Sequence, residues 1–339
     1  MSHLDSFHDR SSRQDSTGGS AQQQLSADRS SVSVALGGGG ARGISHLGVL
    51  RAIADSRYTI AHLTGISIGA IAGAMIAANP DPVAAQRLAL DFLESPEFRR
   101  RRAQMFGLTP AQGYSDRPRG WIDRLRKLIG ARKHFVRAFR SPAVLPEAVL
   151  QHVVDALLPD VAIEDLSLPF SAVAVDVLSG QRVVLDHGPL RDAVRASASI
   201  PGVFPPVVWE DKLLCDIGVY ETVPALTAKQ RPGELTVAVD VSDEVAPIAG
   251  CQNILEMIGR MQQLAEWELR HHSLSHADLI IRPDIGRRAW FDFEDGEALI
   301  ACGYQEAQLQ LESTSDLLVS PSRTANTLPI RQRAIGETA

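Results

Sequence analysis

Gly65-Ile66-Ser67-Ile68-Gly69 is the stretch around which the rest of the chain is organised. The apolar stretch 59–63 precedes it, and the small apolar residues 70–78 follow it. Strand, tight turn and helix in this order form the setting of a nucleophile elbow, in which a strained serine lies between two glycines. Ser67 is therefore a candidate nucleophile at a helix N-terminus, where amide groups and the helix dipole favour negative charge.

A glycine-rich turn precedes this elbow and allows two interpretations. Residues 32–36 predict a short strand, residues 37–43 include five glycines, and residues 44–53 show helical apolar spacing. The pattern Gly38-x-Gly40-x-x-Gly43 fits a dinucleotide-binding fingerprint, which also needs an acidic residue at the end of the next strand. That strand ends in Thr64-Gly65 without one. The nucleotide interpretation is therefore disfavoured.

The second interpretation of the turn is an oxyanion hole. Consecutive glycines allow several backbone N–H groups to point into one concavity, and Arg42 adds a fixed positive charge. Two successive strand–turn–helix units place both turns at the carboxyl edge of the same sheet. Gly38, Gly39, Gly40 and Arg42 are therefore predicted to stabilise the charge that attack by Ser67 creates.

Ser67 needs a proton acceptor, and several side chains are candidates. His46 and His62 are expected to be structural, whereas His271, His272 or His276 could complete a Ser–Asp–His triad. Asp176 lies inside an apolar strand. Asp216 is the stronger candidate, because it directly follows the apolar strand 212–215 and is thereby placed at the same carboxyl edge.

The order of elements predicts an α/β fold, a three-layer α/β/α sandwich with a mostly parallel central sheet. Further strands are expected at residues 171–177, 181–185, 207–209, 212–215, 235–241 and 277–281. Further helices are expected at residues 82–94, 146–158, 189–199, 253–275 and 295–311. The polar residues 1–30 and 313–339 are typical of disordered tails.

Composition and charge narrow the class of protein. The chain has 339 residues, of which 45% are hydrophobic, and its three cysteines favour a reducing compartment over a disulfide framework. No signal peptide is expected at the N-terminus, and the longest apolar run, residues 66–78, is too short to span a bilayer. A cytoplasmic protein, in solution or peripheral at a membrane, is predicted.

One basic segment stands out against the net charge of −6. Residues 99–140 contain 13 Lys and Arg against 2 acidic residues, with apolar residues near helical spacing. This pattern predicts a basic helical insertion that docks on an anionic membrane surface, or a helix packed on the core with a solvated charged face. No recognition motif accompanies the charge, so no nucleic acid partner is expected.

The chain resembles the patatin-like phospholipase family in four motifs, which occur in the same order as in that family. These are Gly38-Gly39-Gly40-Ala41-Arg42-Gly43, Gly65-Ile66-Ser67-Ile68-Gly69, the block Arg195-Ala-Ser-Ala-Ser-Ile-Pro-Gly-Val-Phe204, and Asp216-Ile217-Gly218. The resemblance implies a patatin-like domain over residues 31–312, with the basic insertion at about 99–140. It implies hydrolysis of a phospholipid or another lipid ester by a Ser67–Asp216 dyad, with no catalytic histidine and no metal or organic cofactor.

The chain departs from the family pattern at two positions. Ile217 stands where the family has glycine, and if that glycine uses a positive φ, isoleucine would displace Asp216. Glu221 stands where an asparagine is often found. Two alternatives to a dyad hydrolase therefore stay open: a catalytically weak, membrane-associated binding protein of the same fold, and an α/β-hydrolase esterase with a Ser–Asp–His triad.

Overall fold

The computed structural model describes residues 30–106 and 142–318, except residues 219 and 287. Its central sheet has the strand order β5-β6-β3-β2-β1-β7-β8, with β4 paired to β3. The strands are β1 Ser31–Leu36, β2 Thr59–Gly65, β3 Phe170–Asp176, β4 Arg182–Leu185, β5 Val207–Trp209, β6 Lys212–Cys215, β7 Leu235–Val239 and β8 Leu279–Ile281.

The sheet is parallel at its centre and antiparallel at one side. β2, β1, β7 and β8 pair in parallel, as do β2 and β3, whereas β4 and β6 run antiparallel to β3, and β5 runs antiparallel to β6. Leu36 at the end of β1 lies beside Gly65 at the end of β2. The register therefore brings the glycine-rich turn and the serine elbow together at the carboxyl edge of the sheet.

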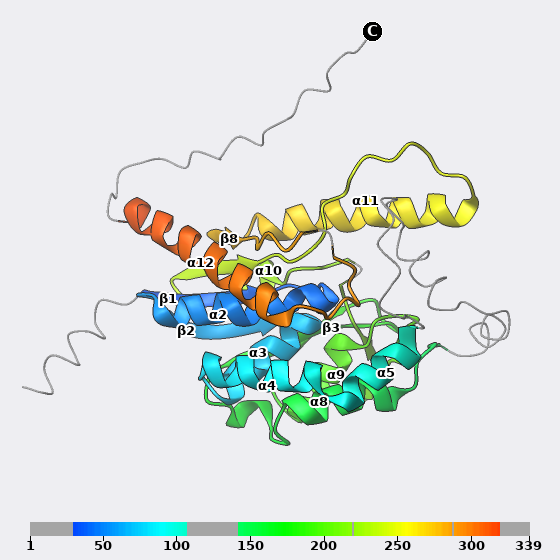
Figure 1. Cartoon of the computed structure of the whole chain (residues 1–339), viewed down its shortest axis with the longest axis horizontal. Helices are drawn as coiled ribbons and strands as arrows, with labels where there is room; N and C mark the ends of the chain where they lie inside the picture. Colours follow the sequence, from blue (N-terminus) through cyan, green and yellow to red (C-terminus); the bar gives the residue numbers. More distant parts are fainter. Residues whose placement is uncertain (1–29, 107–141, 219, 287, 319–339) are drawn as a thin grey trace, which may run out of the picture.

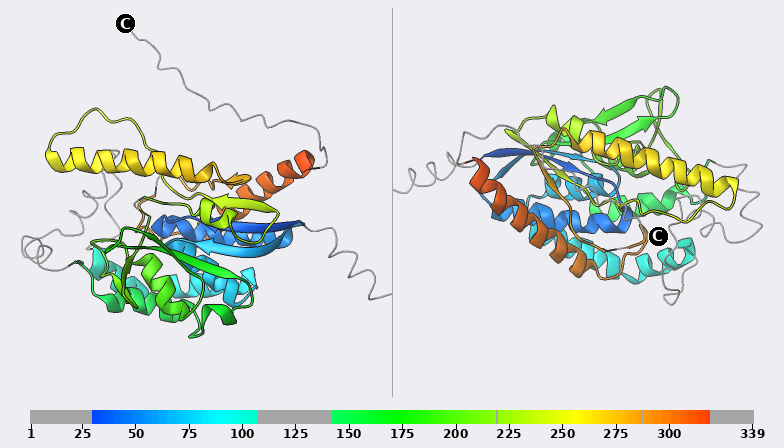
Figure 2. Two further views of the ribbon diagram at one scale, coloured as in Figure 1. Left: turned by 180° about the vertical axis from the view of Figure 1, so that it is seen from behind. Right: turned by 90° about the horizontal axis from the view of Figure 1, so that it is seen from above.

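Helices cover both faces of this sheet (Figure 1). They are α2 Ser45–Asp55, α3 Ile68–Ala78, α4 Pro82–Glu94, α5 Pro96–Phe106, α8 Glu147–Leu157, α9 Leu190–Ala198, α10 Ala225–Lys229, α11 Ile254–Leu274 and α12 Gly296–Leu318, with short 3-10 helices at Gly40–Ile44 and Ile163–Asp165. Below the sheet in Figure 1 lie α3, α4, α8 and α9, and above it α11. Figure 2 shows from above that α12 runs along α2, with which it packs.

Alternating side chains of β1 divide the core between these layers. Val34 and Leu36 pack in the large cluster with α2 and α3, while Ala35 faces the smaller cluster with α10 and Leu274 of α11. Since successive side chains of a strand point to opposite faces, a strand such as β1 that is buried on both faces needs a helix layer on each side. The structure thus confirms the predicted three-layer α/β/α sandwich.

The extent of several predicted segments can be compared with the structure. α12 continues to Leu318, beyond the predicted boundary at residue 312. Residues 107–141, which include most of the predicted basic insertion, and residues 1–29 and 319–339 of the predicted tails lie outside the described residues. Among the described helices, none combines the length and the apolar character that crossing a bilayer requires.

Candidate active site

Ser67 lies in the tight turn between β2 and α3, as its motif predicts. It is the N-cap residue of α3 and has φ 56° and ψ −124°, a strained conformation for a residue with a side chain. A Cβ atom at Gly65 would lie 2.5 Å from the Cα atom of Ala70, and one at Gly69 would lie 2.3 Å from the Leu36 carbonyl oxygen. The two glycines are therefore required for strand and helix to approach around the serine.

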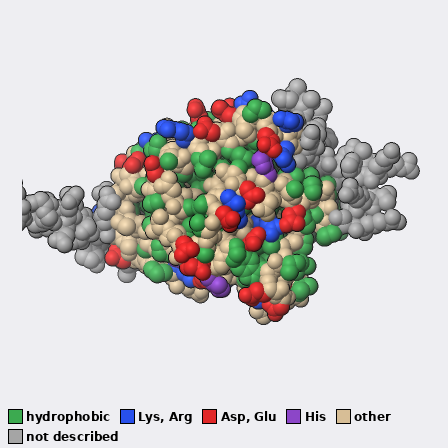
Figure 3. All heavy atoms as spheres, turned by 90° about the horizontal axis from the view of Figure 1, so that it is seen from below, with side chains coloured by type: hydrophobic (Ala, Val, Ile, Leu, Met, Phe, Trp, Pro, Cys, Tyr) green, Lys and Arg blue, Asp and Glu red, His purple; other side chains and the backbone are tan. Residues whose placement is uncertain are grey.

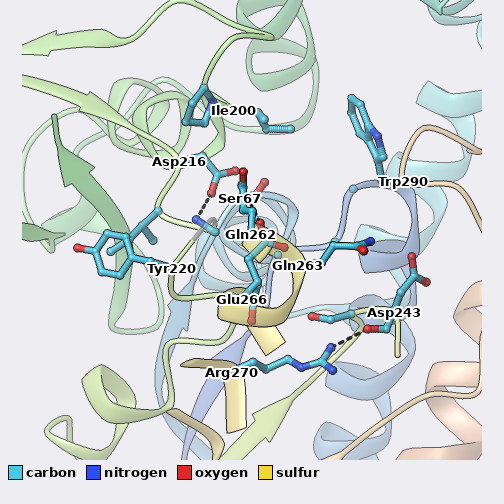
Figure 4. A pocket seen from close by; sticks show the side chains of 18 of the residues that line it. Ser67, Ile200, Asp216, Tyr220, Asp243, Gln262, Gln263, Glu266, Arg270 and Trp290 are labelled. Carbon is cyan, nitrogen blue, oxygen red and sulfur yellow. Dashed lines mark hydrogen bonds between the residues drawn. The ribbon is translucent and has the colours of Figure 1, made fainter. Parts of the chain in front are cut away.

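Asp216 follows β6 and lies beside Ser67, as Figure 4 shows. Its carboxylate accepts a hydrogen bond from the Ser67 side chain and another, 2.7 Å long, from the Gly218 amide. Burial raises the pKa of Asp216 to about 6, although both hydrogen bonds act in the opposite direction. A carboxylate with this pKa is ionised at neutral pH and is a better proton acceptor than an ordinary aspartate.

The C-terminal end of α9 and the residue after it hold the serine and the aspartate together. The Ser67 amide donates to the Ser197 hydroxyl oxygen (3.1 Å), and that hydroxyl donates to the Val173 carbonyl (2.7 Å). The Asp216 amide donates to the Ser199 carbonyl (3.0 Å). Sequence reasoning noted this block only through its resemblance to the family, because a side chain that supports another backbone leaves no periodic signal.

Ile217 does not have the positive φ that would favour glycine at this position. In the described part of the chain, the residues other than glycine with positive φ are Ser67, Glu210 and Asp295. The Ile217 side chain is fully buried and packs with Ile66 and Val173. The substitution at this position therefore adds an apolar contact beneath the elbow and does not displace Asp216.

Glu221, the second departure from the family pattern, is buried against an arginine. The Arg182 Nε atom donates to a Glu221 carboxylate oxygen at 2.5 Å. Burial raises the pKa of Glu221, and the Arg182 charge acts against that rise. Glu221 therefore ties the loop after Asp216 to β4.

Two amides of the glycine-rich turn are engaged in backbone hydrogen bonds. Gly37 and Gly38 donate to the carbonyls of Val239 and Thr222, at 3.1 and 2.8 Å. Neither the Gly39 amide nor the Gly40 amide donates a backbone hydrogen bond to another described residue. Of the three glycines predicted to form the oxyanion hole, Gly38 therefore has its N–H group occupied.

Gly40 cannot carry a side chain in this turn. Its φ is +60°, and a Cβ atom would lie 2.2 Å from the Trp290 carbonyl oxygen. That same carbonyl accepts a hydrogen bond from the Ala41 amide at 2.6 Å. The backbone at Trp290 therefore fixes the turn from outside the sheet, a contact that sequence spacing does not reveal.

Arg42 is buried and already has a counter-charge. Its guanidinium forms an ion pair with Asp243, and its Nε atom donates to the Gly39 carbonyl at 3.1 Å. Since that carbonyl and the Gly40 N–H belong to one planar peptide, the contact fixes the direction of the Gly40 N–H group. Arg42 is thus placed to orient the turn, and Asp243 balances the positive charge that the sequence assigns to the oxyanion hole.

The alternative bases lie in structural environments. Burial lowers the pKa of His46 and of His62 to about 4, and their Nε2 atoms bond the Gly37 carbonyl (2.8 Å) and the Ser171 hydroxyl (2.9 Å). The Asp176 side chain accepts hydrogen bonds from the Leu178, Ser179 and Leu213 amides and from the Ser179 hydroxyl. These hydrogen bonds, above all the one from the Ser179 hydroxyl, lower the pKa of Asp176 to about 2.

A cavity of about 540 Å³ opens above Ser67 and Asp216. Gly39, Gly40 and Arg42 line it together with Ser67 and Asp216, and none of its described lining residues is a histidine. α11 covers one side with the side chains of Gln262, Gln263, Glu266, Trp267 and Arg270 (Figure 4). All six predicted site residues therefore line this cavity, although the Gly38 amide is hydrogen-bonded to the Thr222 carbonyl.

Comparisons with known proteins identify the sequences that this chain resembles. An NTE family protein of Mycobacterium bovis is 31% identical over 215 residues, which is 63% of this chain and 50% of that protein. A patatin-like phospholipase domain-containing protein of Caenorhabditis elegans is 27% identical over 212 residues, 62% of this chain and 13% of that protein. The chain thus spans half or less of the length of these relatives.

Among solved structures, the match with VipD from Legionella pneumophila covers 84% of this chain and 67% of the VipD chain. The two are 14% identical, with a TM-score of 0.41. The ExoU–SpcU complex of Pseudomonas aeruginosa covers 84% of this chain with a TM-score of 0.35. The sequence profile described as patatin-like phospholipase matches residues 34–229, which include Gly38–Gly43, Ser67 and Asp216. This chain belongs to the patatin-like phospholipase family.

Proposed function

We propose that this protein is a serine lipid acyl hydrolase that uses a Ser67–Asp216 dyad. The observation that carries the proposal is the hydrogen bond between the two side chains at the base of the cavity, beside the Gly39 and Gly40 amides. Family membership supports a phospholipid or another lipid ester as substrate.

The proposed reaction has two halves. Asp216 accepts the proton of the Ser67 hydroxyl as its oxygen attacks the ester carbonyl carbon, and the Gly39 and Gly40 amides stabilise the resulting oxyanion. Collapse of this intermediate breaks the ester bond, and the alcohol leaves with the proton from Asp216. Water then attacks the acyl-serine with Asp216 again accepting the proton, which releases the fatty acid and restores Ser67.

A fluorophosphonate probe tests the proposal directly, because it reacts with activated serines. We expect the wild-type protein to be labelled and Ser67→Ala to be unlabelled at the same probe concentration. Ser179→Ala, which changes a serine in the turn between β3 and β4, is a control that should label like wild type. Absence of label on the wild-type protein would favour a binding protein of the same fold over an enzyme.

The raised pKa of Asp216 predicts how activity depends on pH. The base must be ionised to accept the serine proton, so kcat/KM should rise with pH through about 6 and level off above it. An ordinary aspartate would place this limb near pH 4. A rate profile for a water-soluble ester between pH 4 and 8 measures the limb, and a limb at or below pH 4.5 contradicts the proposed base.

We also propose that the protein works at a membrane surface. One face of α11 carries an apolar stripe, Ile254, Met257, Ile258 and Met261, whose side chains are each at least half exposed. Spacing of three or four residues places them on one side of the helix, opposite the side chains that line the cavity. Figure 3 shows the molecule from below, whereas α11 lies above the sheet in Figure 1. On the visible part of that lower face, acidic and basic side chains are interspersed among the apolar ones. An exposed apolar helix face is typical of an interfacial helix.

Vesicle binding tests this proposal. Changing the four stripe residues of α11 to glutamate is expected to lower the vesicle-bound fraction by about tenfold. Leu309→Glu, at an exposed apolar position of α12, is the matched control and should bind like wild type. Vesicles with and without anionic lipid separate the stripe from the basic segment 99–140. Equal binding to both kinds would contradict docking by that segment.

A further inference from the structure

His46 on α2 is a buried side chain that the proposed reaction does not use. It is fully buried, and its Nε2 atom lies 2.8 Å from the carbonyl oxygen of Gly37, which is 9 positions earlier in the chain. Burial lowers the pKa of His46 to about 4, so the ring is uncharged at neutral pH and carries one N–H group. Since a carbonyl oxygen can only accept a hydrogen bond, that N–H group is at Nε2. His46 therefore donates to the Gly37 carbonyl.

The other ring nitrogen of His46 gives the fold no further hydrogen bond. Its Nδ1 atom is buried and has no hydrogen-bond partner among the described residues. A buried nitrogen without a partner is unfavourable, because it has lost its hydrogen bond to water. His46 also does not line the cavity above Ser67 and Asp216, so it contacts no substrate there. The bond to Gly37 is thus the contact through which this side chain can act on the site.

The peptide between Gly37 and Gly38 is held at both of its polar groups. Its carbonyl accepts the hydrogen bond from His46 on α2. Its N–H group, which belongs to Gly38, donates to the Thr222 carbonyl at 2.8 Å. Because a peptide group is planar, two hydrogen bonds on opposite sides fix the direction in which the whole group points. The entry to the glycine-rich turn is therefore held between α2 and the loop that follows Asp216.

This peptide lies beside the nucleophile. A Cβ atom added at Gly38 would lie 3.4 Å from the Cβ atom of Ser67. A Cβ atom added at Gly69, in the first turn of α3, would lie 2.7 Å from the Gly37 carbonyl oxygen. The next two residues along the chain supply the proposed oxyanion amides. A rotation of the peptide would therefore move those amides relative to Ser67.

We propose that His46 is a positioning residue of the oxyanion hole. Its imidazole holds the peptide between Gly37 and Gly38, and this peptide sets the direction of the two amides that follow. The inference rests on the proposed hydrolase function. Amides that are already oriented stabilise the developing charge without reorganising during the reaction. Loss of the hydrogen bond from His46 should therefore slow the chemical step and leave substrate binding almost unchanged.

Kinetics of two His46 variants with a soluble ester test the proposal. His46→Leu removes the donor and keeps an apolar side chain in its place, and we expect kcat to fall by about 10- to 100-fold with KM within about twofold of wild type. His46→Gln restores an N–H group at the ε position and should return kcat to within about fivefold of wild type. Unchanged kcat in His46→Leu, an equal loss in both variants, or a change confined to KM overturns the proposal.

His62→Leu is the matched control. His62 is also buried, burial lowers its pKa to about 4 as well, and its Nε2 atom bonds the Ser171 hydroxyl at 2.9 Å. It does not line the cavity and does not contact the glycine-rich turn through this bond. The variant should have a lower Tm, like His46→Leu, with kcat within about twofold of wild type. An equal loss of kcat in the two leucine variants would show that any lost buried histidine has this effect, which contradicts the proposal.

Hydrogen exchange separates failure of this inference from failure of the proposed function. The Ser67→Ala protein requires no catalysis for this measurement, and the Gly38 amide reports on the held peptide. We expect that amide to exchange about tenfold faster when His46→Leu is added and at an unchanged rate when His62→Leu is added. This result supports the positioning role even if no ester is hydrolysed. An exchange rate at Gly38 that His46→Leu leaves unchanged overturns it.

Discussion

Asp216→Asn is expected to lower kcat/KM for an ester by on the order of 10⁴-fold or more. The amide keeps the size of the carboxyl group and can still accept the Gly218 N–H hydrogen bond, but it cannot take the proton of Ser67. Steady-state kinetics with a soluble ester measures the loss. It should appear in kcat, because proton transfer occurs in the chemical step and not in substrate binding.

The histidines of α11 provide the controls for this prediction. His271→Ala and His272→Ala are expected to hydrolyse the same ester within about twofold of wild type, since neither side chain lines the cavity. Loss of activity in either variant, with Asp216→Asn still active, would establish the triad alternative.

Asp216→Asn is also expected to be more stable than wild type at pH 8. Burial raises the folded-state pKa of Asp216 above 3.8, so the folded state binds its proton more tightly than the unfolded state does. Stability therefore falls as pH rises from about 4 to about 6, and the cost persists above that range. Asparagine has no such cost. Thermal melts should show a higher Tm for Asp216→Asn at pH 8 and no difference near pH 4, which excludes unfolding as the cause of inactivity.

Gly40→Ala is expected to lower kcat/KM by about 10²- to 10³-fold, the typical effect of losing one oxyanion donor. The new methyl group would lie against the Trp290 carbonyl oxygen, and alanine disfavours the +60° φ. Either the turn or the backbone at Trp290 must move, and the Gly40 amide moves with them. Kinetics with a soluble ester measures the change.

Gly180→Ala is the control for backbone strain alone. Gly180 also has a positive φ, +74°, but it lies in the turn between β3 and β4, and no atom lies within 4 Å of the added Cβ position. Its alanine variant should lose about 1 kcal/mol of stability and retain activity. If both variants have the same activity, displacement of the Gly40 amide does not affect catalysis.

The sequence specified the elements that short-range chemistry controls. Glycines on both sides of Ser67 predict the elbow because only small residues allow the close approach of β2 and α3. Apolar strands that alternate with helical spacing predict a layered sheet. The position of Asp216 directly after a strand predicts that it lies at the carboxyl edge. Each strand, turn and helix behind these inferences is predicted from residues that are near one another in the sequence.

Long-range contacts could not be predicted in this way. The Gly38 amide donates to Thr222, and the Ser67 amide is held by Ser197, because segments far apart in the chain happen to meet. The sequence alone did not determine whether Ile217 displaces Asp216, because the φ of Ile217 depends on how the loop after β6 packs beneath the elbow. The structure gives it an ordinary φ and a buried site against Ile66 and Val173.

The sequence by itself thus determined the layered fold, the strained serine and the edge of the sheet at which chemistry is expected, because local backbone preferences and apolar spacing are written in adjacent residues. Only tertiary structure decided which glycine amides are engaged in backbone hydrogen bonds, that Asp243 neutralises Arg42, and that Ser67 and Asp216 line the same cavity as Gly39, Gly40 and Arg42. These features depend on hydrogen bonds and burial between distant segments, which exist only once the chain has packed.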